Sequence, residues 1–180
     1  MENSKEKDRE ILFKQLQGND HKAALSAVKK LRTSGKTSDI PGLILSLKIQ
    51  ESEQIRKEIL ALLRDVNKTD ASVYIIDAIK DPENTSILAG LLGVCWESKL
   101  DFTKYLEVFV SAFLSSNYEA SLEAFTVIEK IFLDYDMPRN KLLSTINLLK
   151  ISYPDLAENK RELALVLLDT LEGMIDINET

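Results

Sequence analysis

A helical unit that recurs about every 32 residues is the feature that most constrains how this chain folds. Three consecutive segments, 37–68, 69–100 and 101–134, are 32, 32 and 34 residues long. Each reads as an apolar helix, a short polar turn and a second, amphipathic helix. One such pair cannot bury its apolar face alone, so the pairs are expected to stack on one another. The recurrence therefore predicts an all-α fold of stacked antiparallel helical hairpins.

Alignment of the three segments brings apolar residues into register. The first helices align Leu43, Ile44 and Leu47 with Ile75, Ile76 and Ile79, and then with Phe109, Val110 and Phe113. The second helices give three rows, which are Ile59, Leu91 and Phe125; Leu62, Val94 and Ile128; and Val66, Ser98 and Phe132. A continuous core through stacked repeats requires rows of this kind. We therefore predict that Leu91 and Phe125 are almost completely buried.

The remaining segments are expected to close the two ends of the stack. We predict a single domain over 1–180, with capping helices in 1–36, three repeats in 37–134, a capping pair in 135–174 and a tail in 175–180. Short connections imply antiparallel neighbours. About nine or ten helices then form about four to five hairpins in a right-handed α-solenoid.

Polar residues mark the expected helix boundaries. The run Gly-Asn-Asp at 18–20 separates a helix over 5–17 from one over 21–34. Pro41 is expected in the first turn of the next helix, where a missing N–H costs nothing. Two later helices are expected to begin at capping boxes, formed by Ser116 with Glu119 and by Asp155 with Glu158.

The segment 39–48, Asp-Ile-Pro-Gly-Leu-Ile-Leu-Ser-Leu-Lys, resembles the first helix of a HEAT repeat. Residues 37–134 as a whole resemble the HEAT-repeat (armadillo-type) α-solenoid family. The motifs of this family are patterns of apolar positions, so the resemblance implies architecture far more than function. The second and third segments depart from it, because they lack a proline at the position of Pro41. Tetratricopeptide repeats have a similar length, but the tryptophan, glycine and tyrosine of that family are missing at their expected spacing.

Composition and charge narrow the classes of partner. Hydrophobic residues make up 44% of the chain and charged residues 29%, which is typical of a folded globular protein. No segment has the apolar core of a signal peptide or of a membrane span, so we expect a cytoplasmic protein. Residues 1–36 carry nine basic and five acidic residues, a net charge of +4, and residues 37–180 carry 14 and 24, a net charge of −10. An acidic body disfavours binding to nucleic acid.

Residues capable of chemistry are few and scattered. The single histidine, His21, begins a helix and is expected at the surface. The single cysteine, Cys95, lies in an apolar run and is expected to be a small buried hydrophobe. Asp134 and Asp136 precede a helix and are better explained as caps than as an acid pair, and 65–76 lacks the glycine and glutamate of a calcium loop. We therefore expect no enzyme activity, no metal and no cofactor.

One surface is a candidate binding site. At about 100° per residue, Lys57, Ala61 and Arg64 lie opposite the core stripe of their helix. The repeat register places on the same face Ala89, Gly93 and Trp96, and then Glu123, Val127 and Lys130. The resemblance to HEAT repeats implies that this face is concave, where Lys57, Arg64, Trp96 and Lys130 are expected to hold a partner around an aromatic anchor. The alternative is that Trp96 folds back over the hairpin end or lies under a flanking helix.

The helix expected over 101–115 is apolar on nearly every side. Its apolar residues are Phe102, Tyr105, Leu106, Val108, Phe109, Val110, Phe113 and Leu114. Such a helix is normally buried from more than one direction, so we expect it in the middle of the stack, and the alternative is a dimer surface. The chain is accordingly expected to be a monomer or a weak dimer.

These features favour a non-catalytic protein–protein interaction scaffold that binds a peptide, a helix or a folded partner along its concave face. Two alternatives are a nucleic-acid-binding HEAT-like protein and a regulatory or lyase-type HEAT-like protein that acts on a bound partner. No motif in the chain identifies the partner.

Overall fold

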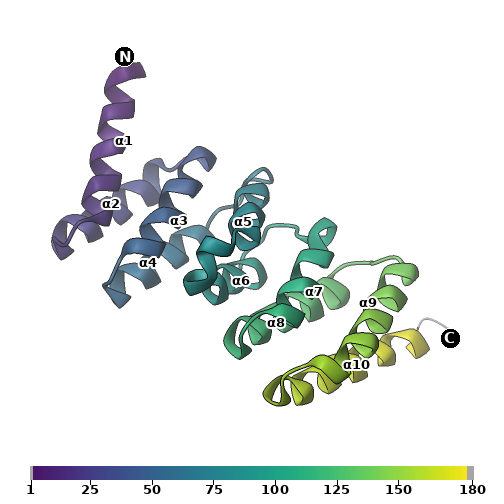
Figure 1. Ribbon diagram of the computed structural model, residues 1–180. Coiled ribbons are helices and arrows are strands. Elements are labelled where there is room, and N and C mark those ends of the chain that lie inside the picture. Colours follow the sequence, from purple (N-terminus) through teal and green to yellow (C-terminus); the bar gives the residue numbers. More distant parts are fainter. Residues whose placement is uncertain (1, 178–180) are drawn as a thin grey trace. The chain divides into compact units, whose positions relative to one another are not determined.

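The computed structural model, shown in Figure 1, describes residues 2–177, with side chains for residues 6–175. Ten α-helices and four short 3₁₀ helices, and no strand, are found among these residues, which confirms the predicted all-α class. They divide into two compact units between Leu100 and Asp101, the point at which the second predicted repeat ends. Residues 178–180 of the expected tail lie outside the described part, and the last helix continues to Ile177, beyond the predicted limit of 174.

The first unit is built from helical hairpins. Its elements are α1 (Glu2–Gln17), α2 (His21–Ser34), η1 (Thr37–Asp39), α3 (Ile40–Ile49), α4 (Glu53–Arg64), α5 (Ala71–Lys80), η2 (Pro82–Ile87) and α6 (Leu88–Glu97). α1 packs on α2, α3 on α4 and α5 on α6, while α3 also contacts α1 and α5, and α4 also contacts α2 and α6. The first helices of the hairpins therefore form one layer of this unit and the second helices form another (Figure 1).

The second unit repeats this pattern with two hairpins. Its elements are η3 (Thr103–Tyr105), α7 (Leu106–Ser115), α8 (Tyr118–Asp134), α9 (Arg139–Ser152), η4 (Tyr153–Asp155) and α10 (Glu158–Ile177). α7 packs on α8 and α9 on α10, and the contacts of α7 with α9 and of α8 with α10 join the two hairpins. α8 and α10 are thus neighbours in the second layer of this unit.

Two of the predicted helix boundaries are displaced. α8 begins after Asn117, whose Oδ1 accepts the backbone N–H of Ala120 at 2.9 Å. Ser116, predicted as the N-cap, instead follows the last turn of α7. α10 begins at Glu158 and not at Asp155, because Asp155 belongs to a separate 3₁₀ turn. Two starts agree with the sequence, since Asp20 caps α2 and Pro41 lies in the first turn of α3. The helix expected from 101 begins as a 3₁₀ turn at Thr103 and continues as α7 from Leu106.

The core contains all the residues predicted for the first helices of the repeats. The nine aligned residues of α3, α5 and α7 are buried, from Leu43 to Phe113. In the second helices, Ile59, Leu62, Leu91 and Val94 are buried as predicted.

The register predicted for the third repeat is wrong by one residue in α8. Phe125 is partly exposed, and Ala124 is fully buried in its place. The buried residues of the first helices are 34 positions apart, as from Ile75 to Phe109, but those of the second helices are 33 apart, as from Leu91 to Ala124. The turn inside the third hairpin is therefore one residue shorter than the alignment assumed.

Two buried amide side chains donate hydrogen bonds to carbonyl groups near the C-terminal ends of helices. Gln50 Nε2 donates to the carbonyl of Leu16 at 2.8 Å, and Asn84 Nδ2 donates to the carbonyl of Ala78 at 3.0 Å. Carbonyl groups in the last turn of a helix have no partner within the helix. These amides satisfy them. Gln50 joins the end of α3 to α1, and Asn84 joins η2 to α5.

Candidate functional site

The four residues predicted for binding lie in both units. Lys57 and Arg64 are on α4 and Trp96 is on α6, in the first unit, whereas Lys130 is on α8, in the second. Lys57 is largely exposed and lies 4.0 Å from Glu53 on its own helix. The structure therefore brings three of the four residues onto neighbouring helices of one unit.

The α4–α6 pair presents Trp96 beside a charged contact. Arg64 Nε lies 2.9 Å from Glu97 Oε2, so this ion pair links α4 to α6 next to Trp96 in the sequence. Trp96 is partly exposed. A Cβ added at Gly90 would lie 3.2 Å from the side chain of Leu60, so the glycine permits close approach of the two helices.

Lys130 does not occupy the position expected from the repeat register. Val127, predicted to share its face, is buried. The correction of one residue in α8 makes Glu129 the counterpart of Arg64, and Leu122 the counterpart of Lys57. Lys130 lies at the edge of this face and pairs with Asp134 at 3.1 Å.

The corrected register shows an apolar surface on α8 and α10. Each helix buries one stripe, which in α8 includes Ala120, Ala124 and Val127 and in α10 includes Ala164, Leu167 and Leu171. The opposite side of the two helices, called the α8–α10 face below, carries five large apolar side chains that are 41% to 64% exposed: Tyr118, Leu122, Leu133, Leu165 and Val166. Because α8 and α10 are neighbours in one layer, both exposed sides point away from the core of the unit.

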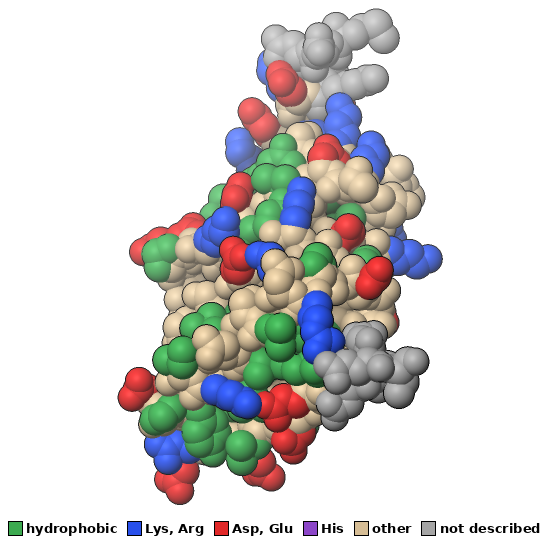
Figure 2. Space-filling model, turned by 90° about the vertical axis from the view of Figure 1, so that its right-hand side faces the viewer, with side chains coloured by type: hydrophobic (Ala, Val, Ile, Leu, Met, Phe, Trp, Pro, Cys, Tyr) green, Lys and Arg blue, Asp and Glu red, His purple; other side chains and the backbone are tan. Residues whose placement is uncertain are grey.

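Hydrophobic side chains are visible at the surface in Figure 2, where green groups are bordered by acidic and basic side chains. Single exposed apolar residues are normal, whereas several on the outer side of two neighbouring helices are a feature of interaction sites. The sequence contains its signal, since Tyr118, Leu122 and Leu133 recur at helical spacing. The displaced register hid this signal, because it placed the outer side of α8 about 100° away, on Glu123, Val127 and Lys130.

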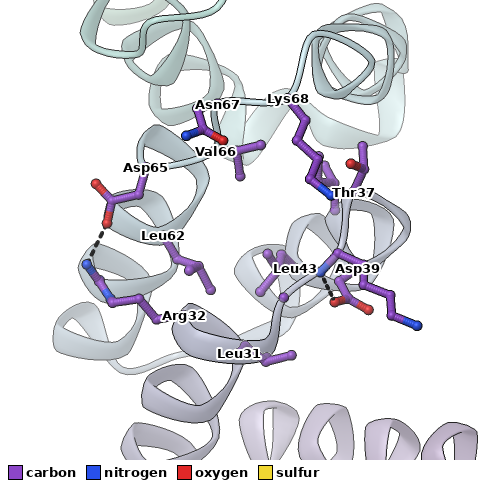
Figure 3. A pocket seen from close by; sticks show the side chains of 13 residues that line it. Leu31, Arg32, Thr37, Asp39, Leu43, Leu62, Asp65, Val66, Asn67 and Lys68 are labelled. Atoms are coloured by element: carbon purple, nitrogen blue, oxygen red, sulfur yellow. Dashed lines mark hydrogen bonds and ion pairs between the residues drawn. The ribbon is translucent and has the colours of Figure 1, made fainter.

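A pocket of about 180 Å³ opens in the first unit between the ends of α2 and α4 and the start of α3. Figure 3 shows Leu43 and Leu62 directed into it, with Thr37 and Lys68 at its margin. Arg32 Nη1 donates to Asp65 Oδ2 at 2.6 Å across one side. The pocket thus has an apolar floor and a polar margin.

Asp39, which also lines this pocket, is buried, and its carboxylate is hydrogen-bonded. Its carboxylate accepts Arg9 Nε at 2.6 Å and the Lys36 backbone N–H at 2.7 Å. Burial acts to raise the pKa of Asp39, but the hydrogen bonds from Arg9 and Lys36 outweigh it, and the pKa lies below its ordinary value of 3.8. A carboxylate held in this way stabilises the fold and is poorly placed to accept a proton from a substrate.

A second groove of about 410 Å³ runs between α7 and α9 in the second unit. Leu106, Val110 and Leu148 contribute its apolar walls. Lys141 and Glu107 form an ion pair at its margin. The groove is suited to an apolar side chain, and its lining offers no acid and base arranged for catalysis.

His21 and Cys95 are placed as predicted. The caps expected at Asp134 and Asp136 are not formed, since Asp134 ends α8 and no side chain of the described residues caps the start of α9. His21 is exposed, with Nε2 3.0 Å from Gln54 Oε1. Cys95 is buried, and burial raises the pKa of its thiol well above the ordinary value. Within residues 6–175 no group of three or more side chains is arranged to hold a metal ion. None of the described helices combines the length and the apolarity needed to cross a membrane.

No family model matches the chain, and no curated protein or solved structure matches it either. The surfaces of the two units therefore provide the evidence for function.

Proposed function

We propose that this chain is a non-catalytic protein-binding scaffold, a HEAT-like, right-handed α-solenoid of about four to five hairpins that acts in the cytoplasm. The order of contacts within each unit supports the architecture, because first helices touch first helices and second helices touch second helices. Stacked repeats produce this order, since each hairpin contacts only its neighbours.

The α8–α10 face carries the functional proposal. Five large apolar side chains exposed on two adjacent helices leave apolar area in water that a partner would cover. Burying apolar area contributes about 25 cal/mol per Å² before the costs of association. The α4–α6 pair offers a second contact region, where partly exposed Trp96 is a suitable anchor beside the Arg64–Glu97 pair.

Affinity capture from cell extract with mass spectrometry tests this proposal when wild type is compared with Leu122→Asp/Val166→Asp. The double variant is expected to lose the partner, because two charges are placed in the apolar contact. Leu143→Asp/Ile151→Asp is a matched control, since both residues are exposed apolar side chains on α9. Identical sets of captured proteins from all three would contradict the proposal.

Trp96→Ala tests the α4–α6 region separately. We expect it to weaken binding of the captured partner by about 2 kcal/mol, the scale of an interface anchor, with little change in thermal stability. Loss of stability together with binding would return Trp96 to a structural role. Duplex DNA is the control ligand, and binding to it that disappears on addition of salt would favour the nucleic-acid alternative.

A further inference from the structure

We propose that the α8–α10 face binds a cationic amphipathic helix of the partner protein. The inference rests on the proposed protein-binding function and names the chemistry of the partner at the same surface. The apolar anchors, the charges that surround them and the shape of a surface made from two helices all support this partner.

The apolar anchors project from one side of the second layer. Leu122 lies two positions from buried Ala120 and from buried Ala124, so at about 100° per residue it points almost directly away from the core. On α10, Val166 lies two positions from buried Ala164 and points outward, whereas Leu165 directly follows Ala164 and lies at the flank of the exposed side, about 100° from it. These side chains therefore offer apolar contacts from two adjacent helices.

The charges around these anchors are strongly acidic. α8 contains four acidic residues and one basic residue, and α10 contains five and two. Five carboxylates form no ion pair among the described residues, and they belong to Glu119, Glu129, Glu158, Glu162 and Asp169. Glu129, Glu162 and Asp169 lie among the exposed apolar positions of the face.

The basic residues of the two helices do not neutralise this charge. Lys130 is paired with Asp134. Arg161 donates to the backbone carbonyls of Leu156 and Pro154, both at 3.1 Å, and Lys160 is buried. A partner with lysine or arginine beside its apolar residues would neutralise the free carboxylates, while an acidic partner or an anionic membrane would be repelled.

A helix is the partner geometry that best fits two adjacent helices. An amphipathic helix presents apolar anchors at positions i, i+3, i+4 and i+7 along one side, with basic residues on both flanks. Neither N-terminal helix of a second copy meets this description. α2 exposes Lys22, Lys29 and Lys30 without a large exposed apolar residue, and α1 exposes Ile11 but carries four acidic residues against four basic ones. The occupant is therefore assigned to another protein.

Fluorescence anisotropy with a labelled synthetic peptide tests the inference on the full chain. The probe is a leucine–lysine peptide of about 18 residues with leucine at helical spacing, and a leucine–glutamate peptide of the same pattern is its control. We expect the lysine peptide to bind wild type and the glutamate peptide not to bind. Binding is expected to weaken when NaCl is raised from about 0.05 M to about 0.5 M.

Matched variants locate the site. Leu122→Asp/Val166→Asp, and separately Glu162→Lys/Asp169→Lys, are each expected to raise the Kd of the lysine peptide by about tenfold or more. Leu143→Asp/Ile151→Asp adds to α9 the same charge as the first pair and is expected to leave the Kd unchanged. Circular dichroism confirms that each variant is folded.

Three results would overturn the inference. They are equal binding of the two peptides, an equal effect of the α9 control variant, and light scattering that shows a dimer dissociated by Leu122→Asp/Val166→Asp. If capture of a cellular partner still depends on Leu122 and Val166 while the lysine peptide fails, the protein-binding function stands and the cationic helix is excluded. If that capture is also independent of both residues, the proposed function of the face fails as well.

Discussion

Lys160 shows how a single residue can serve an element far away in the sequence. Its side chain is 5% exposed, and Nζ donates to the carbonyls of Phe113, Leu114 and Ser116 at 3.1, 2.7 and 3.0 Å. These carbonyls close α7, where the negative end of the helix dipole favours a cation. Burial lowers the pKa of the Lys160 ammonium group. The lysine therefore acts as a C-terminal cap supplied by α10.

Lys160→Met is predicted to destabilise the second unit. Methionine preserves most of the apolar stem but removes the ammonium donor. The carbonyls of Phe113 and Ser116 keep the hydroxyl of Ser121 as a donor, whereas that of Leu114 loses its side-chain donor, which costs about 1–3 kcal/mol. Chemical denaturation followed by circular dichroism measures this change. Lys150→Met is the control, because Lys150 is exposed and its pair with Glu172 is at the surface, where such pairs contribute little. Equal stability of both variants would contradict the capping role.

Asp39 is predicted to make the stability of the first unit depend on pH in the acidic range. The pKa of Asp39 is lower in the folded protein than its ordinary value of 3.8, so the folded state favours the carboxylate. This contribution is complete above the ordinary pKa and is lost as pH falls through the lowered pKa. Between about pH 5 and about pH 2, the free energy of unfolding should fall more in wild type than in Asp39→Asn. Denaturation at several pH values checks this, and parallel curves would show that Asp39 contributes nothing.

At the scale of the element, α8 shows the effect of one residue in a turn. A shift of one position rotates a helix face by about 100°, which moves a residue from the core to its edge. Ala124 and Val127 therefore face the core, while Phe125 lies at the edge and Leu122 on the outer side. α7 shows no such difference, since none of its apolar residues singled out in the sequence is exposed.

The corrected register predicts unequal effects for Leu91→Ala and Phe125→Ala. Leu91 is fully buried, so its truncation should cost about 2–5 kcal/mol through lost burial and a residual cavity. Phe125 is only partly buried, so its truncation to alanine should lower the free energy of unfolding by less than about 2 kcal/mol. This is below the range for a core phenylalanine. Equilibrium denaturation compares the two. A larger loss for Phe125→Ala would restore the register derived from the sequence.

At the scale of the whole molecule, the described residues form two units, each with its own core. Phe109 and Phe113 lie in the core of the second unit, and Ile59 and Leu91 lie in that of the first. In repeat proteins stability is approximately a sum over repeats and the interfaces between neighbours. A local substitution is therefore expected to act mainly on its own unit.

Hydrogen exchange tests this expectation with Lys160→Met. Amide protection should fall in α7 to α10 and remain close to wild type in α1 to α6, because partial opening costs less free energy than global unfolding. Exchange measured by mass spectrometry resolves the two units through their peptides. A uniform fall in protection along the chain would indicate a single cooperative core and would contradict independent opening of the units.

The presence of the helices, and the buried residues of the first helix in each repeat, were determined by the sequence alone. Apolar spacing near 3.6 residues and nearby breakers are local properties, so Leu43, Ile75 and Phe109 could be placed in the core from their positions along the chain. The burial of Cys95 was also anticipated, from the apolar run in which it lies.

Only the tertiary structure decided which side of α8 faces water and what closes α7. The first depends on the length of a turn, since one residue fewer between α7 and α8 rotates the second helix against its neighbours. The second depends on Lys160, whose three carbonyl partners lie more than 40 positions away in the sequence. The α8–α10 face likewise exists because α10 packs beside α8. Such contacts arise from the packing of distant segments, and the local periodicity of the chain does not encode them.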